Sequence, residues 1–417
     1  MPSESLGAQR RGNVLLRNAS FRRFWFARSA SHLGDGASLI ALLLYVKEIE
    51  HSGLAIGALL LAQSLPHLLG PVVGAAVDRF DLKWLMVGCE LTQALIFAGM
   101  AWWLPGFPVL LGLVAIASVL DTTFSPASNS AVPTLVEEPD LLQANAWVGS
   151  SLNLQVAVGP LLGGLLVTTF GVRGALAANA ISFAISGALL VGLPRIRHDL
   201  GKSTRSVRVA TVEGLIYAWK TPAIRAVVLG VFLVVAFVAV DNVALVFLVR
   251  DVLHTNALGF GIVAAAFGVG MLVASIGLTS RRSISNPALL VLLGWLLSGI
   301  GTLATGLAPN VIAAGGMQAM AGVGNGFDNV ATPTLIQRLV PPAMLGRVFG
   351  LFGTAAFAGS TLAYVLAGVL LDATSPRATF IVGGVGAIAS VLVIGPLLWR
   401  AIHQISAAPS APHHDSP

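Results

Sequence analysis

Twelve apolar stretches, each about as long as a bilayer-spanning helix, divide this chain into two halves that partly repeat each other. Ser128–Asn129 and Pro133–Val136 match Asp328–Asn329 and Pro333–Ile336 at an offset of 200 residues, and Gly164–Leu166 matches Gly368–Leu370 at a slightly larger offset. Repeated six-helix halves are typical of two-domain transporters, whose substrate path runs between the halves near the bilayer midplane. We therefore expect an all-α integral membrane fold with twelve transmembrane helices.

The positions of the apolar stretches define the expected organisation. The spans of the first half are 25–46, 54–77, 84–103, 109–130, 144–170 and 175–193; those of the second half are 226–249, 258–278, 288–307, 311–332, 348–371 and 379–401. The predicted domains are an N-terminal half (1–198), a cytoplasmic linker (199–223) and a C-terminal half (224–417) that ends in a disordered tail.

Composition supports a membrane protein. Hydrophobic residues make up 56% of the chain and charged residues 10%, against about 25% charged residues in soluble domains. An isoelectric point near 10.1 would suggest a nucleic-acid partner in a soluble protein. Here the basic residues lie between apolar segments, so we expect a lipid bilayer and no nucleic acid as partner.

The basic residues also predict the orientation, because they favour the cytoplasmic side. With the N-terminus inside, twenty of the 24 Lys and Arg residues, Arg28 among them, fall on the inner side. Only Lys47, Arg173, Arg250 and Arg377 fall outside. We expect a multi-pass protein of the plasma membrane with both termini in the cytoplasm.

The loop after the second span contains Gly74, Asp78, Arg79 and Lys83. This spacing resembles the G-x-x-x-D-R-x-x-x-K/R loop of the major facilitator superfamily. The resemblance implies a gating loop that latches the two halves in one conformation, with Asp78 as a gating residue. An ordinary charged turn is the alternative interpretation.

The fifth span contains Gly159, Pro160, Gly163 and Gly164, which resemble the G-P-x-x-G-G element of antiporters in that superfamily. Small residues allow helices to pack closely, and proline kinks a helix. Helix packing without an antiport role is the alternative.

The stretch 124–129, together with Pro133, 144–146 and 346–350, resembles the branch that contains macrolide-efflux proteins and the enterobactin exporter. The resemblance implies proton-driven export of drugs or small natural products. Two features depart from related exporters: the fourth span lacks an R-x-x-Q-G element, and Gln93 stands where an arginine often follows the acid of the third span.

Five acids lie inside predicted spans: Asp35, Glu90, Asp121, Asp241 and Asp328. A charge at the centre of a membrane helix costs about 2.5–3.5 kcal/mol on insertion scales, so acids there are candidates for proton binding or for attracting cations. Asp35, Glu90 and Asp121 are the proton-coupling candidates. Structural hydrogen bonding between helices is the alternative for each.

Further polar residues are candidates for the substrate cavity. They are Asp241, Asn242, Asn325, Asp328, Asn153 and Gln155, and His67 and Gln63 are also placed to face it. Interhelical hydrogen bonding is again the alternative.

The features together predict a secondary active transporter that works by alternating access, with a hydrophobic or cationic small molecule and protons as partners. A siderophore exporter, a solute uptake symporter and, more remotely, a non-transporting receptor or assembly factor remain alternatives. The chain contains no nucleotide-binding loop, catalytic triad or metal-ligand cluster, so we expect no enzyme activity, cofactor or metal. We expect a monomer.

Overall fold

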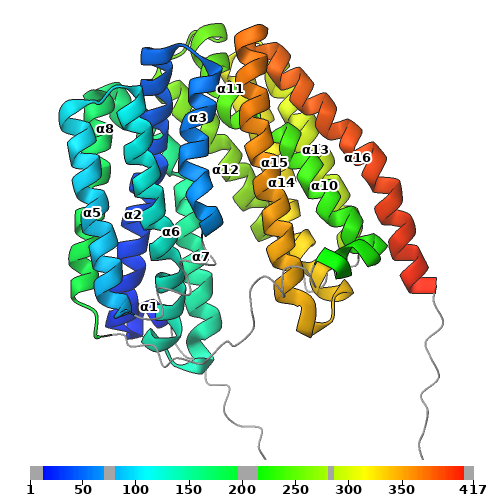
Figure 1. Ribbon diagram of the computed structural model, residues 1–417, viewed down its shortest axis with the longest axis horizontal. Helices are drawn as coiled ribbons and strands as arrows, with labels where there is room; N and C mark the ends of the chain where they lie inside the picture. The colour runs from blue at the N-terminus through cyan, green and yellow to red at the C-terminus, as the bar shows by residue number, and fades with distance from the viewer. Residues whose placement is uncertain (1–12, 70–79, 196–214, 280–285, 408–417) are drawn as a thin grey trace, which may run out of the picture. The chain divides into compact units, whose positions relative to one another are not determined.

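The computed structural model describes residues 13–69, 80–195, 215–279 and 286–407, and these residues form helices and short connections without a strand. The chain divides into two compact units (Figure 1). The first comprises Met1–Ser203 and Val249–Gly268, and the second comprises Thr204–Leu248 and Val269–Pro417. The predicted domain limits at 198 and 224 stay a prediction.

The helices follow one another in chain order. Up to Val191 they are α1 (Val14–Arg17), α2 (Ala19–Glu50), α3 (Gly53–Ser64), η1 (Leu65–Leu69), α5 (Leu82–Trp103), α6 (Phe107–Leu135), η2 (Glu138–Asp140), α7 (Leu141–Ala157) and α8 (Gly159–Val191). From Pro222 they are α10 (Pro222–Val238), α11 (Asp241–Phe247), η3 (Leu248–Val252), α12 (Ala257–Thr279), α13 (Pro287–Leu307), α14 (Val311–Leu339), η4 (Pro342–Met344), α15 (Leu345–Ala373) and α16 (Pro376–Ala407).

The observed helices can be compared with the expected spans one by one. Nine helices among the described residues are long and apolar enough to cross a membrane. α14 is not among these nine, and α3 with η1 forms a shorter apolar helix. The second predicted span, 54–77, continues beyond Leu69 into residues outside the described ranges. The exact number of twelve spans stays a prediction.

α8 covers the later part of the expected fifth span and most of the sixth, and its helical run is broken at Gly171. This residue has φ 70° and ψ −178° inside an otherwise helical segment. Glycine adopts a positive φ without the steric cost that a Cβ atom imposes. The break falls between the predicted fifth and sixth spans, so the chain reverses there.

The fifth span is itself interrupted at Val158, between α7 and α8. Pro160 follows directly, and it lacks the N–H group that would continue the backbone ladder. The predicted kink therefore lies where the proline requires it.

Glycines next to this break bring α2 and α8 into backbone contact. A Cβ atom on Gly159 would lie 2.7 Å from the Cα of Gly36, and one on Gly163 would lie 2.9 Å from the Cα of Ala37. On the other side of α8, a Cβ on Gly164 would lie 3.0 Å from the Cα of Gly261 in α12, within the same unit. The glycines of the G-P-x-x-G-G element thus form a surface of α8 on which α2 and α12 pack.

Each unit has its own apolar core. The first core includes Phe21, Phe24 and Phe124, which come from α2 and α6. The second includes Trp295 and Leu398, which come from α13 and α16.

The internal repeat extends to the helix boundaries. α6, η2 and the start of α7 have counterparts in α14, η4 and the start of α15, each beginning 204 residues later, as at Phe107 and Val311 or Leu141 and Leu345. The helices repeat at an offset of 204 residues, whereas the sequence match at Pro133 and Pro333 has an offset of 200. The two alignments therefore differ by about one helical turn.

We predict that Gly159→Ala destabilises the protein, because the added methyl group meets the backbone of Gly36, which cannot move aside as a flexible side chain could. Gly112→Ala in α6 is the matched control: no heavy atom lies within 4 Å of the added Cβ, and alanine favours a helix over glycine by about 1 kcal/mol. Thermal unfolding of the detergent-solubilised chain should show a lower midpoint for Gly159→Ala and an equal or higher one for Gly112→Ala. Equal midpoints for Gly159→Ala and the parent chain would contradict the close packing of α2 and α8.

Candidate functional site

A polar cavity of about 80 Å³ lies within the first unit. Its walls come from α2, α3, η1, α5, α6 and α7. The lining residues are Asp35, Ser38, Leu42, Gln63, His67, Gln93, Phe97, Val114, Ala117, Ser118, Asp121 and Gln155. The cavity therefore brings together two of the three proton-coupling candidates, one substrate-cavity candidate and the two additional residues His67 and Gln63.

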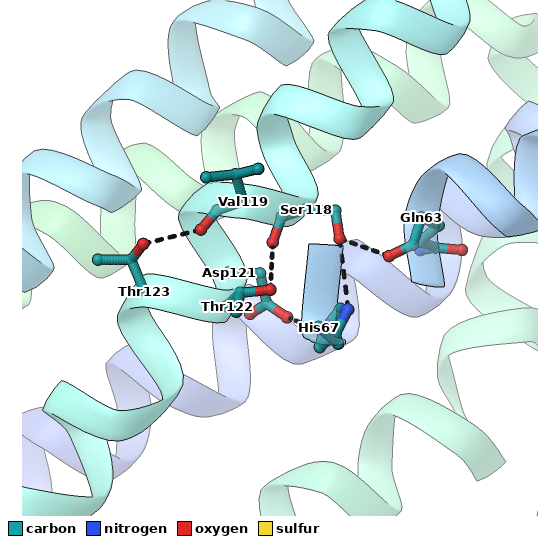
Figure 2. Close-up of polar contacts among 7 residues, drawn as sticks. All are labelled: Gln63, His67, Ser118, Val119, Asp121, Thr122 and Thr123. Atoms are coloured by element: carbon teal, nitrogen blue, oxygen red, sulfur yellow. Dashed lines mark hydrogen bonds and ion pairs between the residues drawn. The ribbon is translucent and has the colours of Figure 1, made fainter. Parts of the chain in front are cut away.

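Asp121 and His67 face each other across this cavity, as Figure 2 shows. The Nε2 atom of His67 lies 3.2 Å from Oδ2 of Asp121, and the two side chains are 46% and 44% exposed. The two residues come from η1 and α6, which are far apart in sequence. A half-exposed pair of this kind remains accessible to a ligand or a proton.

The backbone next to His67 explains why this pair forms. α3 ends at Ser64 and continues as the 3-10 turn η1, which contains Pro66. Pro66 has no N–H group to donate to the carbonyl of Gln63, as the 3-10 pattern would require. The Ser118 hydroxyl on α6 donates to that carbonyl instead, and its Oγ lies 3.4 Å from Nδ1 of His67 (Figure 2).

Asp35 reaches the same cavity from α2, where neutral groups hold it. The Asn179 side-chain amide on α8 donates to the Ser38 hydroxyl at 2.8 Å and lies 3.4 Å from Oδ1 of Asp35. The Ser38 hydroxyl donates to the backbone carbonyl of Asp35 at 3.1 Å. Among the described residues, Asp35 therefore has neutral hydrogen-bonding neighbours and no cation in a salt bridge with it.

Glu90 lies in the protein interior rather than on the cavity wall. It is 1% exposed on α5, with Ser31 and Ser186 beside its carboxyl group. Its role in proton coupling stays a prediction.

Arg28 is a buried neighbour of the candidate acids that the sequence interpretation missed. We expected it on the cytoplasmic side, but it is 8% exposed, lies over the Phe124 ring at 4.8 Å, and interacts electrostatically with Asp121, Glu90 and Asp35. Its Nε atom has no hydrogen-bond partner among the described residues. The acids of the first unit are therefore partly neutralised by a buried arginine.

The spacing along α2 contains the signal that would have found this arginine. Arg28, His32 and Asp35 stand at positions i, i+4 and i+7, which lie on one face of a helix. His32 is 9% exposed and interacts with Asp121 and Gln155. The same face of α2 thus carries a cation, a histidine and an acid toward the cavity region.

Asp241 and Asp328, the two acids of the second unit that lie inside predicted spans, have neutral hydrogen-bond donors as their partners within the part of the chain that the structure describes. Asp328 accepts from Trp295 Nε1 at 2.9 Å and from the Thr332 hydroxyl at 2.5 Å. Both carboxylate oxygens of Asp241 accept from the Gln318 amide, at 3.0 and 2.8 Å. These bonds favour the structural interpretation for Asp328 and Asp241.

The remaining substrate-cavity candidates lie apart from the cavity lining. Asn325 accepts from Asn329 at 3.0 Å on α14, Asn242 is exposed on α11, and Asn153 is half-buried on α7. Their role in binding a substrate stays a prediction.

Most of the predicted gating loop cannot be placed. Gly74, Asp78 and Arg79 lie outside the described residues. Lys83 is described: it stands near the start of α5, is 9% exposed, and its Nζ lies 5.0 Å from the centre of the Trp84 ring.

A family model described as "Transmembrane secretion effector" matches residues 13–417. Among known proteins, the uncharacterized MFS-type transporter YfiS of Bacillus subtilis is 29% identical over 381 residues, which cover 86% of this chain and 88% of the relative. The multidrug efflux pump Tap of Mycolicibacterium fortuitum is 26% identical over 377 residues (85% and 90%). Macrolide efflux protein A of Streptococcus pyogenes is 23% identical over 395 residues (91% and 95%).

Solved structures with a similar fold include transporters of several kinds. A mutant of the nucleoside transporter NupG superposes with a TM-score of 0.76 at 15% identity, covering 90% of this chain and 99% of the other. A bacterial homologue of the iron transporter ferroportin, in an inward-facing state, has a TM-score of 0.70 at 18% identity (93% and 98%). At these identities the likeness concerns the fold alone.

The contrast between the acids of the two units can be tested by alanine substitution. We predict that Asp328→Ala lowers the free energy of unfolding by about 1–3 kcal/mol, because the buried donors of Trp295 and Thr332 lose their acceptor. Asp121→Ala should cost about 0–1 kcal/mol, because it breaks a half-exposed pair. Denaturant unfolding followed by tryptophan fluorescence would measure both changes in the free energy of unfolding. An equal or larger decrease for Asp121→Ala would contradict the structural role of Asp328 and the weak pairing of Asp121.

Proposed function

We propose a function from the premise that the chain belongs to the transmembrane secretion effector family of the major facilitator superfamily. Membership confirms the resemblance seen in the sequence motifs, and it makes the chain a multi-pass membrane transporter of a small molecule, in a class of transporters rather than enzymes. The proposal is that the chain exports small organic cations or amphipathic drugs by alternating access, in exchange for protons.

One observation carries the proposal: two acids line one cavity whose other walls are amides, hydroxyls, one histidine and apolar groups. Asp35 and Asp121 lie beside Gln63, Gln93, Gln155 and Phe97, and the described lining contains no lysine or arginine. Carboxylates attract a cation, amides supply hydrogen bonds, and an aromatic face adds a cation–π contact. An anionic substrate finds few favourable partners there, which argues against an anionic siderophore.

The size of the cavity indicates which part of a substrate it takes. Drug-sized ligands fill pockets of about 300–1,000 Å³, whereas this cavity measures about 80 Å³. The cavity therefore suits a cationic head group, with the apolar remainder of the substrate outside it. The named relatives Tap and macrolide efflux protein A support a drug as that substrate.

The His67–Asp121 pair gives a mechanism for exchanging a cation for a proton. Histidine is the side chain that ordinarily gains and loses a proton between pH 5 and 8. A protonated imidazole pairs with Asp121 and excludes a substrate cation from the carboxylate, whereas a neutral imidazole leaves the negative charge available. Arg28, His32 and Asp35 from α2 and Glu90 from α5 are the other charged or titratable groups in this region.

Asp35 is the second proton-coupling residue of the proposal. Its neighbour Asn179 is a neutral donor, so Asp35 can accept a proton without breaking an ion pair. A proton there lowers the negative charge of the cavity, which weakens cation binding and favours release. Binding of a proton or a cation thereby shifts the balance between the conformational states of the transporter.

Transport measurements in inside-out vesicles test this function. With an imposed pH gradient, tetraphenylphosphonium should accumulate in vesicles that contain the parent chain. Asp35→Asn should abolish accumulation against a gradient while downhill movement survives, because the amide keeps the size and hydrogen bonding of the acid but cannot exchange a proton. Asp121→Asn should reduce both accumulation against a gradient and downhill movement, because it removes the carboxylate that binds the cation.

Glu48→Gln is the matched control, an exposed acid on α2 outside the cavity. It should leave both forms of transport unchanged. Uphill transport that persists in Asp35→Asn would remove this residue from the coupling mechanism, and gradient-driven movement in the opposite direction would favour an uptake symporter.

A further inference from the structure

A second cavity, of about 130 Å³, lies in the second unit between α10 and α16. Arg225 from the first turn of α10 and Arg400 from near the end of α16 both line it. The rest of the described lining is apolar apart from backbone groups, and it includes no acid. Its described lining shares no residue with the polar cavity of the first unit.

The two arginines are available to bind an anion. Neither forms an ion pair with an acid among the described residues. Arg225 is half-buried and oriented by Trp219: its Nη1 donates to the Trp219 carbonyl at 3.3 Å, and its guanidinium lies 5.7 Å from the centre of the indole ring. Guanidinium groups bind phosphate oxygens through paired hydrogen bonds, so this end of the cavity suits a phosphate group.

The wall beside the arginines suits a hydrocarbon chain. Leu229 and Leu397 line the cavity and are 38% and 52% exposed, while Ile394 behind them is 3% exposed. Trp219 and Trp399 lie close to the two arginines in sequence and are 62% and 40% exposed. Tryptophan is enriched at the level of lipid head groups, so this end of α10 and α16 matches the boundary between head groups and acyl chains.

We propose that this cavity binds one anionic phospholipid of the cytoplasmic leaflet. The lipid phosphate lies between Arg225 and Arg400, and an acyl chain runs along Leu229 and Leu397. The volume of about 130 Å³ accommodates the phosphate region rather than a whole lipid. We infer the cytoplasmic leaflet because the sequence predicts that both arginines lie on the cytoplasmic side. Anionic lipids of that leaflet attract clustered arginines.

Native mass spectrometry of the detergent-solubilised full chain tests the site, with phosphatidylglycerol and phosphatidylcholine of equal chain length as the probes. The parent chain should retain one phosphatidylglycerol in preference to phosphatidylcholine. The double variant Arg225→Gln with Arg400→Gln should bind phosphatidylglycerol about 30-fold more weakly, the loss expected for two basic residues at an anionic surface.

Two further variants test whether the loss of binding depends on the position of the arginines and on the apolar wall. Arg22→Gln with Arg195→Gln removes the same charge from exposed arginines outside the cavity, and it should leave lipid binding unchanged. Leu397→Trp keeps both arginines but fills the apolar wall, and it should also reduce binding. The proposal is overturned if the double arginine variant retains the lipid as well as the parent chain does, if phosphatidylcholine binds equally well, or if inorganic phosphate displaces the lipid completely.

Discussion

A carboxylate buried among membrane helices needs a cation or hydrogen-bond donors near it. The two units of this protein provide these partners in different ways. In the first unit Asp121 has an ionisable partner, His67, and a buried arginine nearby. In the second unit Asp241 and Asp328 have amide, indole and hydroxyl donors. A partner that can change its charge allows a carboxylate to exchange ligands, whereas fixed neutral donors hold it in one arrangement. This difference supports the proposal that ion exchange takes place in the first unit.

The exchange site depends on close helix packing. Asp35 can approach Asn179 because α2 and α8 meet through glycines at positions 36 and 159. The break between α7 and α8 lies next to the same contact, where Pro160 interrupts the backbone ladder. The glycine–proline element thus has a structural role, the positioning of α2, that supports the proposed chemistry of Asp35. In the repeat, Ala363, Ala367 and Gly368 stand 204 residues after Gly159, Gly163 and Gly164, and all three are buried small residues.

Much of the fold follows from the sequence because a bilayer limits a spanning segment to about 20 apolar residues. The long helices and the kink at Pro160 follow directly from that limit and from the missing proline N–H. The acids of the cavity were also identified, since an ionisable residue in an apolar segment is conspicuous. The partners of those acids were not identified, because His67 meets Asp121 only through the tertiary packing of η1 on α6. Arg28 was counted among the residues of the cytoplasmic side, because a count of basic residues predicts the side of the membrane but not the burial of a side chain.

The central claim is that a substrate cation and a proton exclude each other at the Asp121 carboxylate. Proton release on binding measures this directly, by adding tetraphenylphosphonium to the purified chain in weakly buffered detergent solution with a pH indicator. The account predicts release of up to one proton per cation bound near pH 6, in proportion to the fraction of the histidine that is protonated, and a clearly smaller release in His67→Gln. Binding of the cation without proton release by the parent chain would contradict the account.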